Sequence, residues 1–280
     1  VVRMLVSHGV THAELGVARR DGGPVETDPR AIWRRFAGHF HLFRGTPSAM
    51  WLEHAFATLF DIDSPLDATT ADAHFDAIEA RLATPAYRPR ALFDRFGIEL
   101  LATTDGALDD LGWHKAIAES GWAARVIPTY RPDAVIDPEG EGFAANLDRL
   151  AEITGEDTGH WAGYLAAHRA RRAYFKDHGA TATDHGHPTA QTADLSATEA
   201  ATLFARIRKG GASPADAALF RAQMLTEMAK MSLDDGLVMQ IHAGSHRNHA
   251  AQVFATYGRD AGFDIPTRTD WVGGLKPLLD

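Results

Sequence analysis

Residues that could move protons or bind an anion stand at the ends of short apolar stretches in this chain of 280 residues. Arg131 ends one stretch, Asp184 and His185 end a second, His242 ends a third, and Asp105 ends a fourth. Arginine holds a carboxylate through two parallel hydrogen bonds, whereas Asp and His exchange protons and hydrogen-bond to hydroxyls. These residue types suit proton transfer on a small anionic substrate.

Each of these residues also has an ordinary structural explanation. Asp105 could cap the helix that follows its strand, Arg131 could pair with Asp133, and His242 could be a satisfied core histidine. Pro132 favours a functional role for Arg131, because a proline keeps the preceding residue extended and so fixes where the guanidinium begins. Both explanations remain open for each residue.

Two segments carry the highest density of such groups. Residues 183–187 place the Asp184 carboxylate beside two imidazoles, which could bind a metal, move protons or hydrogen-bond sugar hydroxyls. The alternative is a helix-capping Asp flanked by exposed histidines. In residues 239–249, His242 precedes a turn of small residues that leads to Arg247 and Asn248, while His246 and His249 could belong to a surface loop.

The elements that carry these residues alternate between strand and helix. Short apolar runs predict strands, and apolar residues at three- and four-residue intervals predict helices. We expect strands at 100–105, 125–131, 180–185 and 237–242, and helices at 108–119, 143–153, 161–178 and 214–231. Ser213 as N-cap and Pro214 at the first helical position mark the start of the last helix. The first ninety residues predict helices, with a turn at 44–48.

Alternating strands and helices favour a parallel sheet with helical crossovers. No glycine-rich phosphate loop follows any strand, which argues against a nucleotide-binding open sheet. Catalytic groups at the C-terminal ends of successive strands are typical of a (β/α)₈ barrel. The sequence therefore predicts an α/β fold of barrel type.

The amino-acid composition and the absence of several motifs exclude further classes of protein and of site. The formal charge of −9 argues against nucleic acid and anionic membranes as partners. The absence of cysteine excludes thiolate catalysis, so any metal must rest on His and carboxylate. No apolar stretch approaches the ~20 residues that span a bilayer, and no Ser-His-Asp order, nucleophile elbow or P-loop occurs. We expect a soluble, cytoplasmic protein.

Several segments together resemble the uronate isomerase (glucuronate isomerase) family of the amidohydrolase superfamily. They are residues 41–47, 51–54, 103–105, 109–111, 114–117, 128–133, 183–186, 224–229, 236–248, 262–266 and 275–278. The segments occur in order and with similar spacing over nearly the whole chain. The resemblance implies a distorted (β/α)₈ TIM barrel of amidohydrolase type. Residues 1–95 would be a helical region inserted after the first barrel strand, and residues 96–280 would supply about four βα units.

The resemblance also implies an activity and roles for named residues. The enzyme would interconvert D-glucuronate with D-fructuronate, and D-galacturonate with D-tagaturonate, by moving a proton between C2 and C1. Arg131 and Arg247 would bind the substrate, and Asp184 would contact its hydroxyls and take part in catalysis. His242 would be catalytic and would lie beside the reacting carbons or a divalent metal, zinc or manganese. The remaining metal ligands would lie outside this chain, and we expect a homo-oligomer.

Some features of the family do not occur in this sequence. They are a His-x-His pair on the first strand, a His-Tyr pair after it, and a metal-binding Asp on the eighth strand. We therefore expect the chain to be part of a longer protein whose other strands complete the barrel. Two alternatives remain: a metal-dependent hydrolase or decarboxylase of the same superfamily, and a truncated, non-catalytic binding module.

Overall fold

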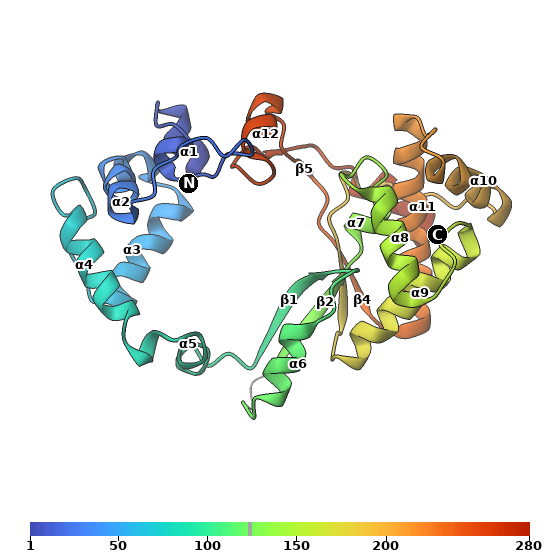
Figure 1. Ribbon diagram of the computed structural model, residues 1–280, viewed down its shortest axis with the longest axis horizontal. Coiled ribbons are helices and arrows are strands. Elements are labelled where there is room, and N and C mark those ends of the chain that lie inside the picture. The colour runs from blue at the N-terminus through green and yellow to red at the C-terminus, as the bar shows by residue number, and fades with distance from the viewer. Residues whose placement is uncertain (123–124) are drawn as a thin grey trace. The chain divides into compact units, whose positions relative to one another are not determined.

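The computed structural model describes residues 1–122 and 125–280 and forms two compact units (Figure 1). Unit 1 comprises Val1–Ile98 with Ser245–Pro266, and unit 2 comprises Glu99–Gly244 with Thr267–Asp280. Within the described residues, no helix has the length and apolar character needed to cross a membrane.

Unit 1 is mainly helical, which confirms the helices predicted for the first ninety residues. Its core contains Leu5, Phe40, Phe43 and Phe56. Thr46 accepts a hydrogen bond from the Ala49 N–H at the start of α3, as expected from the predicted turn. The elements of this unit are α1 (Val2–Ser7), η1 (Ala13–Leu15), α2 (Pro29–Gly38), η2 (Phe40–Phe43), α3 (Pro47–Phe60), α4 (Ala71–Leu82), η3 (Pro85–Tyr87), α5 (Pro89–Arg95), β5 (Ser245–His246), α12 (Ala251–Tyr257) and β6 (Ile265–Pro266).

The segment 245–266 packs against the start of the chain within unit 1. The ring of His12 stacks on Tyr257 at 4.5 Å between centroids, and the Arg20 N–H donates to the Thr256 carbonyl at 2.9 Å. The short strands β5 and β6 pair antiparallel. Residues 245–266 and the start of the chain therefore belong to one packed unit, although they are far apart in the sequence.

Unit 2 contains a parallel sheet of four strands in the order β1-β2-β3-β4, which confirms the predicted parallel α/β arrangement. The strands are β1 (Leu100–Gly106), β2 (Arg125–Arg131), β3 (Ala182–His185) and β4 (Val238–Ile241). In register, Gly106 lies beside Arg131 and Asp184 lies beside Gln240. The carboxyl ends of neighbouring strands thus reach the same edge of the sheet.

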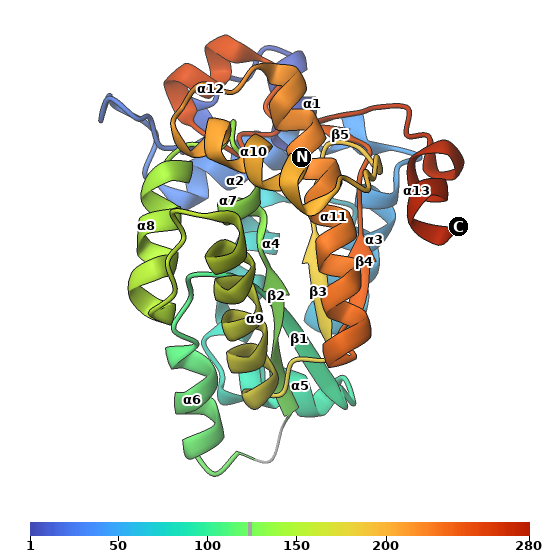
Figure 2. The ribbon, with the colours of Figure 1, turned by 90° about the vertical axis from the view of Figure 1, so that its right-hand side faces the viewer.

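Helices cover one face of this sheet, with α8, α9 and α11 lying along it (Figure 2). The helices of unit 2 are α6 (Gly112–Glu119), α7 (Asp133–Ile136), α8 (Phe143–Thr154), α9 (Trp161–Asp177), α10 (Ala197–Arg208), α11 (Pro214–Asp235) and α13 (Trp271–Leu279). Ser213 caps α11 as predicted, in a capping box with Asp216. The helix expected from 108 begins only at Gly112, because Leu111 adopts a left-handed conformation (φ +54°).

The core of unit 2 lies between its parallel sheet and the helices that cover the sheet. Tyr130, Tyr164, Phe175, Phe204 and Phe220 are fully buried there. The Tyr130 hydroxyl lies 2.8 Å from Nδ1 of His168 on α9, so Tyr130 points from β2 into the helix layer. Since successive strand residues point to opposite faces, its neighbour Arg131 points to the other face.

Candidate functional site

Five residues form a cluster at the carboxyl ends of β2, β3 and β4, and we call it the strand-end cluster: Arg131, Asp133, Asp184, Gly186 and His242. Arg131 donates from Nε to Oδ2 of Asp133 at 2.8 Å, and its Nη1 lies 3.5 Å from Oδ2 of Asp184. Nε2 of His242 lies 3.1 Å from Oδ1 of Asp184. Asp184 therefore lies between the arginine and the histidine.

Strand alternation explains why these side chains meet. Thr183 and His185 lie on the helix side of β3, where the Thr183 hydroxyl is 2.9 Å from Nε2 of His185. Asp184 points the opposite way, as Arg131 does on β2. The His242 N–H donates to the His185 carbonyl at 3.2 Å, which continues the β3–β4 pairing to the start of the next turn. Local strand geometry thus gathers the three predicted residues.

The chemistry of this cluster is that of anion binding and proton transfer. The Arg131 guanidinium is partly exposed, while the Asp184 side chain is mostly buried. An arginine held at Nε still has the N–H groups of both Nη atoms, which can bind a carboxylate in a bidentate manner. Asp184 and His242 supply a carboxylate and an imidazole close enough to exchange a proton with a substrate bound beside them.

Three histidines near the strand-end cluster, His168, His185 and His187, are buried. Burial, reinforced by the positive Arg172 and Arg169, lowers the pKa of His168 to about 3. Burial also lowers the pKa of His187 to about 4 and that of His185 well below its ordinary value. These imidazoles remain neutral at physiological pH, and His185 faces the helix layer. Residues 183–187 contribute the Asp184 side chain and the Gly186 backbone to the strand-end cluster.

Asp105 has a different environment from the one expected of a helix cap. Its Oδ2 accepts a hydrogen bond from the Thr103 hydroxyl at 2.7 Å and lies 3.7 Å from Nε2 of His114. Helix α6 begins after Leu111 and has no side-chain cap. The capping explanation for Asp105 is therefore wrong, because the turn at 106–111 separates the strand end from the helix start.

Arg247 belongs to unit 1, whereas the strand-end cluster belongs to unit 2. Within unit 1 its Nη1 lies 3.9 Å from Oδ2 of Asp264. The other carboxylate oxygen of Asp264 accepts from the N–H of Asn248, which has a left-handed backbone (φ +52°). Asp264 therefore contacts both the side chain of Arg247 and the turn that follows it.

The part of the chain that the structure describes does not supply a full set of ligands for the predicted metal. Among residues 1–122 and 125–280, no three His, Asp or Glu side chains converge in a way that could hold a metal ion. His242 and Asp184 form only a pair. The residues present thus do not make a complete metal site.

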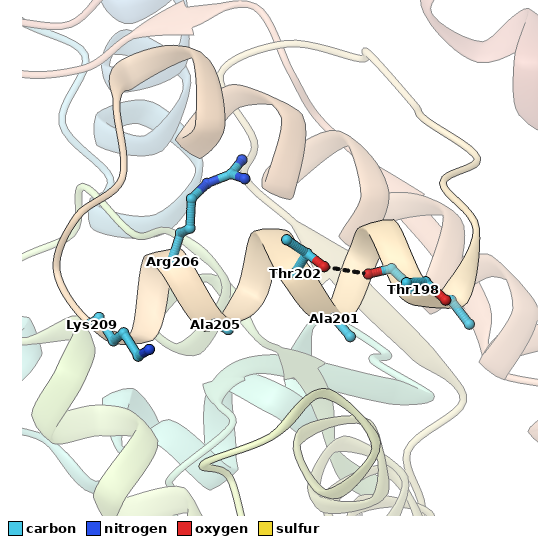
Figure 3. A pocket seen from close by; sticks show the side chains of 7 residues that line it. Thr198, Ala201, Thr202, Ala205, Arg206 and Lys209 are labelled. Atoms are coloured by element: carbon cyan, nitrogen blue, oxygen red, sulfur yellow. Dashed lines mark hydrogen bonds between the residues drawn. The ribbon is translucent and has the colours of Figure 1, made fainter.

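A shallow hollow elsewhere in unit 2 lies along one face of α10 (Figure 3). Small side chains dominate its lining, and the Thr202 hydroxyl is used in a bond to the Thr198 carbonyl at 2.8 Å. It is lined by Ala197, Thr198, Ala201, Thr202, Ala205, Arg206 and Lys209. None of the strand-end cluster residues lines it, so it is not the candidate site.

Sequence reasoning missed the importance of two members of the cluster. Asp133 was expected only as an alternative, structural partner of Arg131, and Gly186 only as part of a motif. In the structure, the second carboxylate oxygen of Asp133 accepts from the Gly186 N–H at 3.1 Å. The short Arg-Pro-Asp spacing was the available indication, since it keeps Asp133 within reach of Arg131 and of the β3 end.

Comparison with known proteins identifies the family to which this chain is similar. A family model described as glucuronate isomerase matches residues 22–280. The chain is 65% identical over its whole length to the uronate isomerase of Mesorhizobium japonicum, and 62% identical to that of Rhizobium meliloti, in each case covering 60% of the relative. The chain therefore spans about 60% of the length of these curated relatives.

Solved structures agree with this result. The crystal structure of glucuronate isomerase from Caulobacter crescentus matches 99% of this chain with a TM-score of 0.95 at 59% identity, and 58% of that chain is covered. The uronate isomerase from Thermotoga maritima matches 91% of this chain with a TM-score of 0.85 at 26% identity, and 56% of that chain is covered. The chain thus has an α/β fold with a parallel sheet, as these solved structures have. The chain belongs to the glucuronate isomerase family.

Proposed function

We propose that the full-length protein is a uronate isomerase, which interconverts D-glucuronate with D-fructuronate and D-galacturonate with D-tagaturonate. Family membership supports the reaction class. The observation that carries the proposal in this chain is the convergence of Arg131, Asp184 and His242 at three successive strand ends. A carboxylate-binding group beside a proton-transfer pair is what an aldose–ketose isomerisation of a sugar acid requires.

The reaction moves hydrogen without any external oxidant. In the open-chain aldose, a base removes the proton from C2, and the electrons of that bond form the C1–C2 double bond of an enediol. Protonation at C1 then creates the new C–H bond, while the oxygen on C2 loses its proton and becomes the ketone. The oxygen on C1 gains a proton and becomes the terminal hydroxyl. Substrate and product therefore have the same mass.

Each proposed residue has a role in this scheme. Arg131 binds the substrate carboxylate, Asp184 hydrogen-bonds the sugar hydroxyls and takes part in proton transfer, and His242 acts beside the reacting carbons. Arg247 is proposed as a second substrate-binding arginine. A divalent metal, zinc or manganese, with His242 as one ligand, also stays a prediction. Because the described residues do not complete a metal site, the scheme uses the side chains alone.

We further propose that β1–β4 belong to a distorted (β/α)₈ barrel, in which residues 1–95 form a helical insertion and residues 96–280 supply about four βα units. Two observations support this proposal: the four parallel strands are neighbours in chain order, and helices α8, α9 and α11 lie on one face of the sheet. Parallel sheets are normally covered on both faces. Closure of the sheet into a barrel would cover the face that α8, α9 and α11 leave open. A structure of the full-length protein in which the sheet does not close would contradict it.

Mass spectrometry tests the proposed reaction against its enzymatic rivals. The full-length protein incubated with D-glucuronate should give a new keto-uronate of unchanged mass. A hydrolase would add water and a decarboxylase would lose carbon dioxide, so either change in mass would contradict the isomerase. A folded full-length protein that binds the sugar acid without converting it would instead favour the binding module. Size-exclusion chromatography with light scattering tests the expected homo-oligomer.

A further inference from the structure

Asp133 contacts the ends of two neighbouring strands through its two carboxylate oxygens. Its Oδ2 accepts from Nε of Arg131 at 2.8 Å, and its Oδ1 accepts from the N–H of Gly186 at 3.1 Å. Arg131 ends β2 and Gly186 follows β3 directly. A single carboxylate thus fixes the guanidinium of one strand relative to the backbone of the next.

The way in which Asp133 binds Arg131 leaves the rest of the guanidinium available. The bond uses Nε, whereas one N–H of each of Nη1 and Nη2 points along the edge away from Nε, with Nη1 3.5 Å from Oδ2 of Asp184. Bidentate recognition of a carboxylate needs a guanidinium in a defined plane. An arginine side chain without such a partner has several rotatable bonds and loses more conformational entropy when it binds.

Gly186 is close to the same groups. A Cβ atom added at this position would lie 2.5 Å from Oδ2 of Asp133, still closer to Nη2 of Arg131, and 3.2 Å from Cε1 of His242. These are the ends of side chains and not backbone atoms. An alanine would therefore be accommodated by displacement of the guanidinium and the carboxylate, without a change in the backbone.

We infer that Asp133 is a positioning residue, which orients the Arg131 guanidinium toward a substrate carboxylate, and that Gly186 permits this orientation because it has no side chain. The inference rests on the proposed function, since it takes Arg131 to be the carboxylate-binding group. It assigns specificity for a sugar acid to a pair of residues rather than to the arginine alone.

Electrostatic attraction alone predicts that loss of the Asp133 carboxylate would strengthen, and not weaken, the binding of a substrate carboxylate. A negative charge beside Arg131 weakens the attraction of the site for an anion, so removal of the Asp133 charge alone would tighten binding. If orientation dominates, removal of the carboxylate loosens binding instead. The sign of the change in affinity therefore distinguishes the two effects.

The test uses Asp133→Ala, Asp133→Asn and Gly186→Ala in the full-length protein, with Asp137→Ala as the matched control. Asp137 is the C-cap residue that follows the same short helix, α7, and it also pairs with an arginine, Arg221, at 2.6 Å. We expect Asp133→Ala to raise the KM for the hexuronate by about 10- to 100-fold with kcat changed much less, the size expected for loss of a charge-assisted hydrogen bond. Asparagine can accept only one of the two hydrogen bonds, so Asp133→Asn should have an intermediate effect. Asp137→Ala should leave KM within about twofold.

Two non-reacting ligands separate positioning from general stability. L-Gulonate and D-glucitol differ only in a carboxylate replaced by a CH₂OH group, and both are tested as competitive inhibitors. The preference for L-gulonate should fall in Asp133→Ala and in Gly186→Ala, while the weak inhibition by D-glucitol should stay unchanged. Thermal unfolding identifies any variant that is merely misfolded.

A double-mutant cycle shows whether Asp133 acts through Arg131. In an Arg131→Met background, Asp133→Ala should have no further effect on the KM, because the group that it positions is gone. Additive effects, an unchanged KM in Asp133→Ala or a lowered KM would each overturn the inference while the proposed function stands. A folded wild-type protein that neither converts a hexuronate nor binds L-gulonate would overturn the proposed function, and this inference with it.

Discussion

Nε2 of His242 lies 3.1 Å from Oδ1 of Asp184, so the side chains at the ends of β4 and β3 form a contacting pair. This pair has a direct consequence for catalysis. Asp184→Asn keeps the shape of the side chain but removes its charge and its capacity to accept a proton. We expect kcat to fall by about 100-fold or more, the usual contribution of a general acid or base, with little change in the melting temperature.

The pairing also predicts that the two residues act together. His242→Asn should lower kcat by a similar factor, and the double variant should be only slightly worse than either single one, because residues that act as a unit are not additive. Steady-state kinetics of the four proteins measures this. Fully multiplicative losses would mean that Asp184 and His242 serve separate steps.

Arg131 should determine the affinity for the substrate. Arg131→Met removes the guanidinium, so the KM for the hexuronate should rise by about 100-fold, while kcat falls less. Arg131→Lys keeps the charge but loses the bidentate geometry, and it should be intermediate. Kinetics and thermal unfolding are measured on the same preparations. A large loss of melting temperature with an unchanged KM would mean that Arg131 is a structural partner of Asp133.

The buried histidines predict a loss of stability in acid. Burial, followed by the nearby Arg172 and Arg169, lowers the pKa of His168 from the ordinary 6.5 to about 3 in the folded state. Between these two values the unfolded chain binds the additional proton, so protonation favours unfolding. The stabilisation is complete above about pH 6.5 and decreases as the pH falls toward 3. Each such histidine contributes a slope of up to about 1.4 kcal/mol per pH unit.

Denaturant unfolding between pH 7 and pH 5 measures this slope. His168→Asn does not titrate in this range, so its free energy of unfolding should depend less on pH than that of the wild type. His54→Asn, at an exposed histidine, serves as the control and should keep the wild-type slope. An unchanged slope in His168→Asn would show that His168 is not the group responsible.

A buried ion pair in the helix layer predicts a large stability effect. Arg172 is fully buried and donates from Nε and Nη2 to the two carboxylate oxygens of Asp235, at 2.6 and 2.8 Å. Asp235→Ala leaves this guanidinium buried without its counter-charge, which should cost about 3–5 kcal/mol in the free energy of unfolding. Replacing both residues, as in Arg172→Met with Asp235→Leu, should recover much of the loss. A loss below 1 kcal/mol in Asp235→Ala would contradict this account.

The elements of unit 2 could be predicted from the sequence because local patterns determine them. The strand at 125–131 and the start of the helix at Pro214 agree with the structure, since apolar runs and an N-cap followed by proline are local features. Helix α10 was not predicted, although its capping box of Ser196 and Glu199 is visible in the sequence. Residues 245–266 pack against His12 through contacts between residues more than 200 positions apart in the sequence. The periodicity of apolar residues contains no information about such contacts.

The candidate site could be predicted only in part from the sequence. Arg131, Asp184 and His242 could be found because each one ends a strand, and parallel strands bring their ends together. The role of Gly186 could not be found, because it depends on the absence of a side chain near Arg131 and His242, which only coordinates reveal. The capping alternative for Asp105 is wrong, because the turn at 106–111 that separates it from α6 has no strong sequence pattern.

Proton NMR of D-glucuronate and D-galacturonate incubated with the full-length protein in D₂O, with and without added zinc or manganese, tests the proposed isomerase activity. An isomerase should give new keto-uronate signals and a loss of the aldose signals, with every carbon of the substrate retained, and the Asp184→Asn protein should give no conversion on the same timescale. A folded full-length protein that leaves both sugar acids unchanged under all of these conditions would contradict the proposed activity.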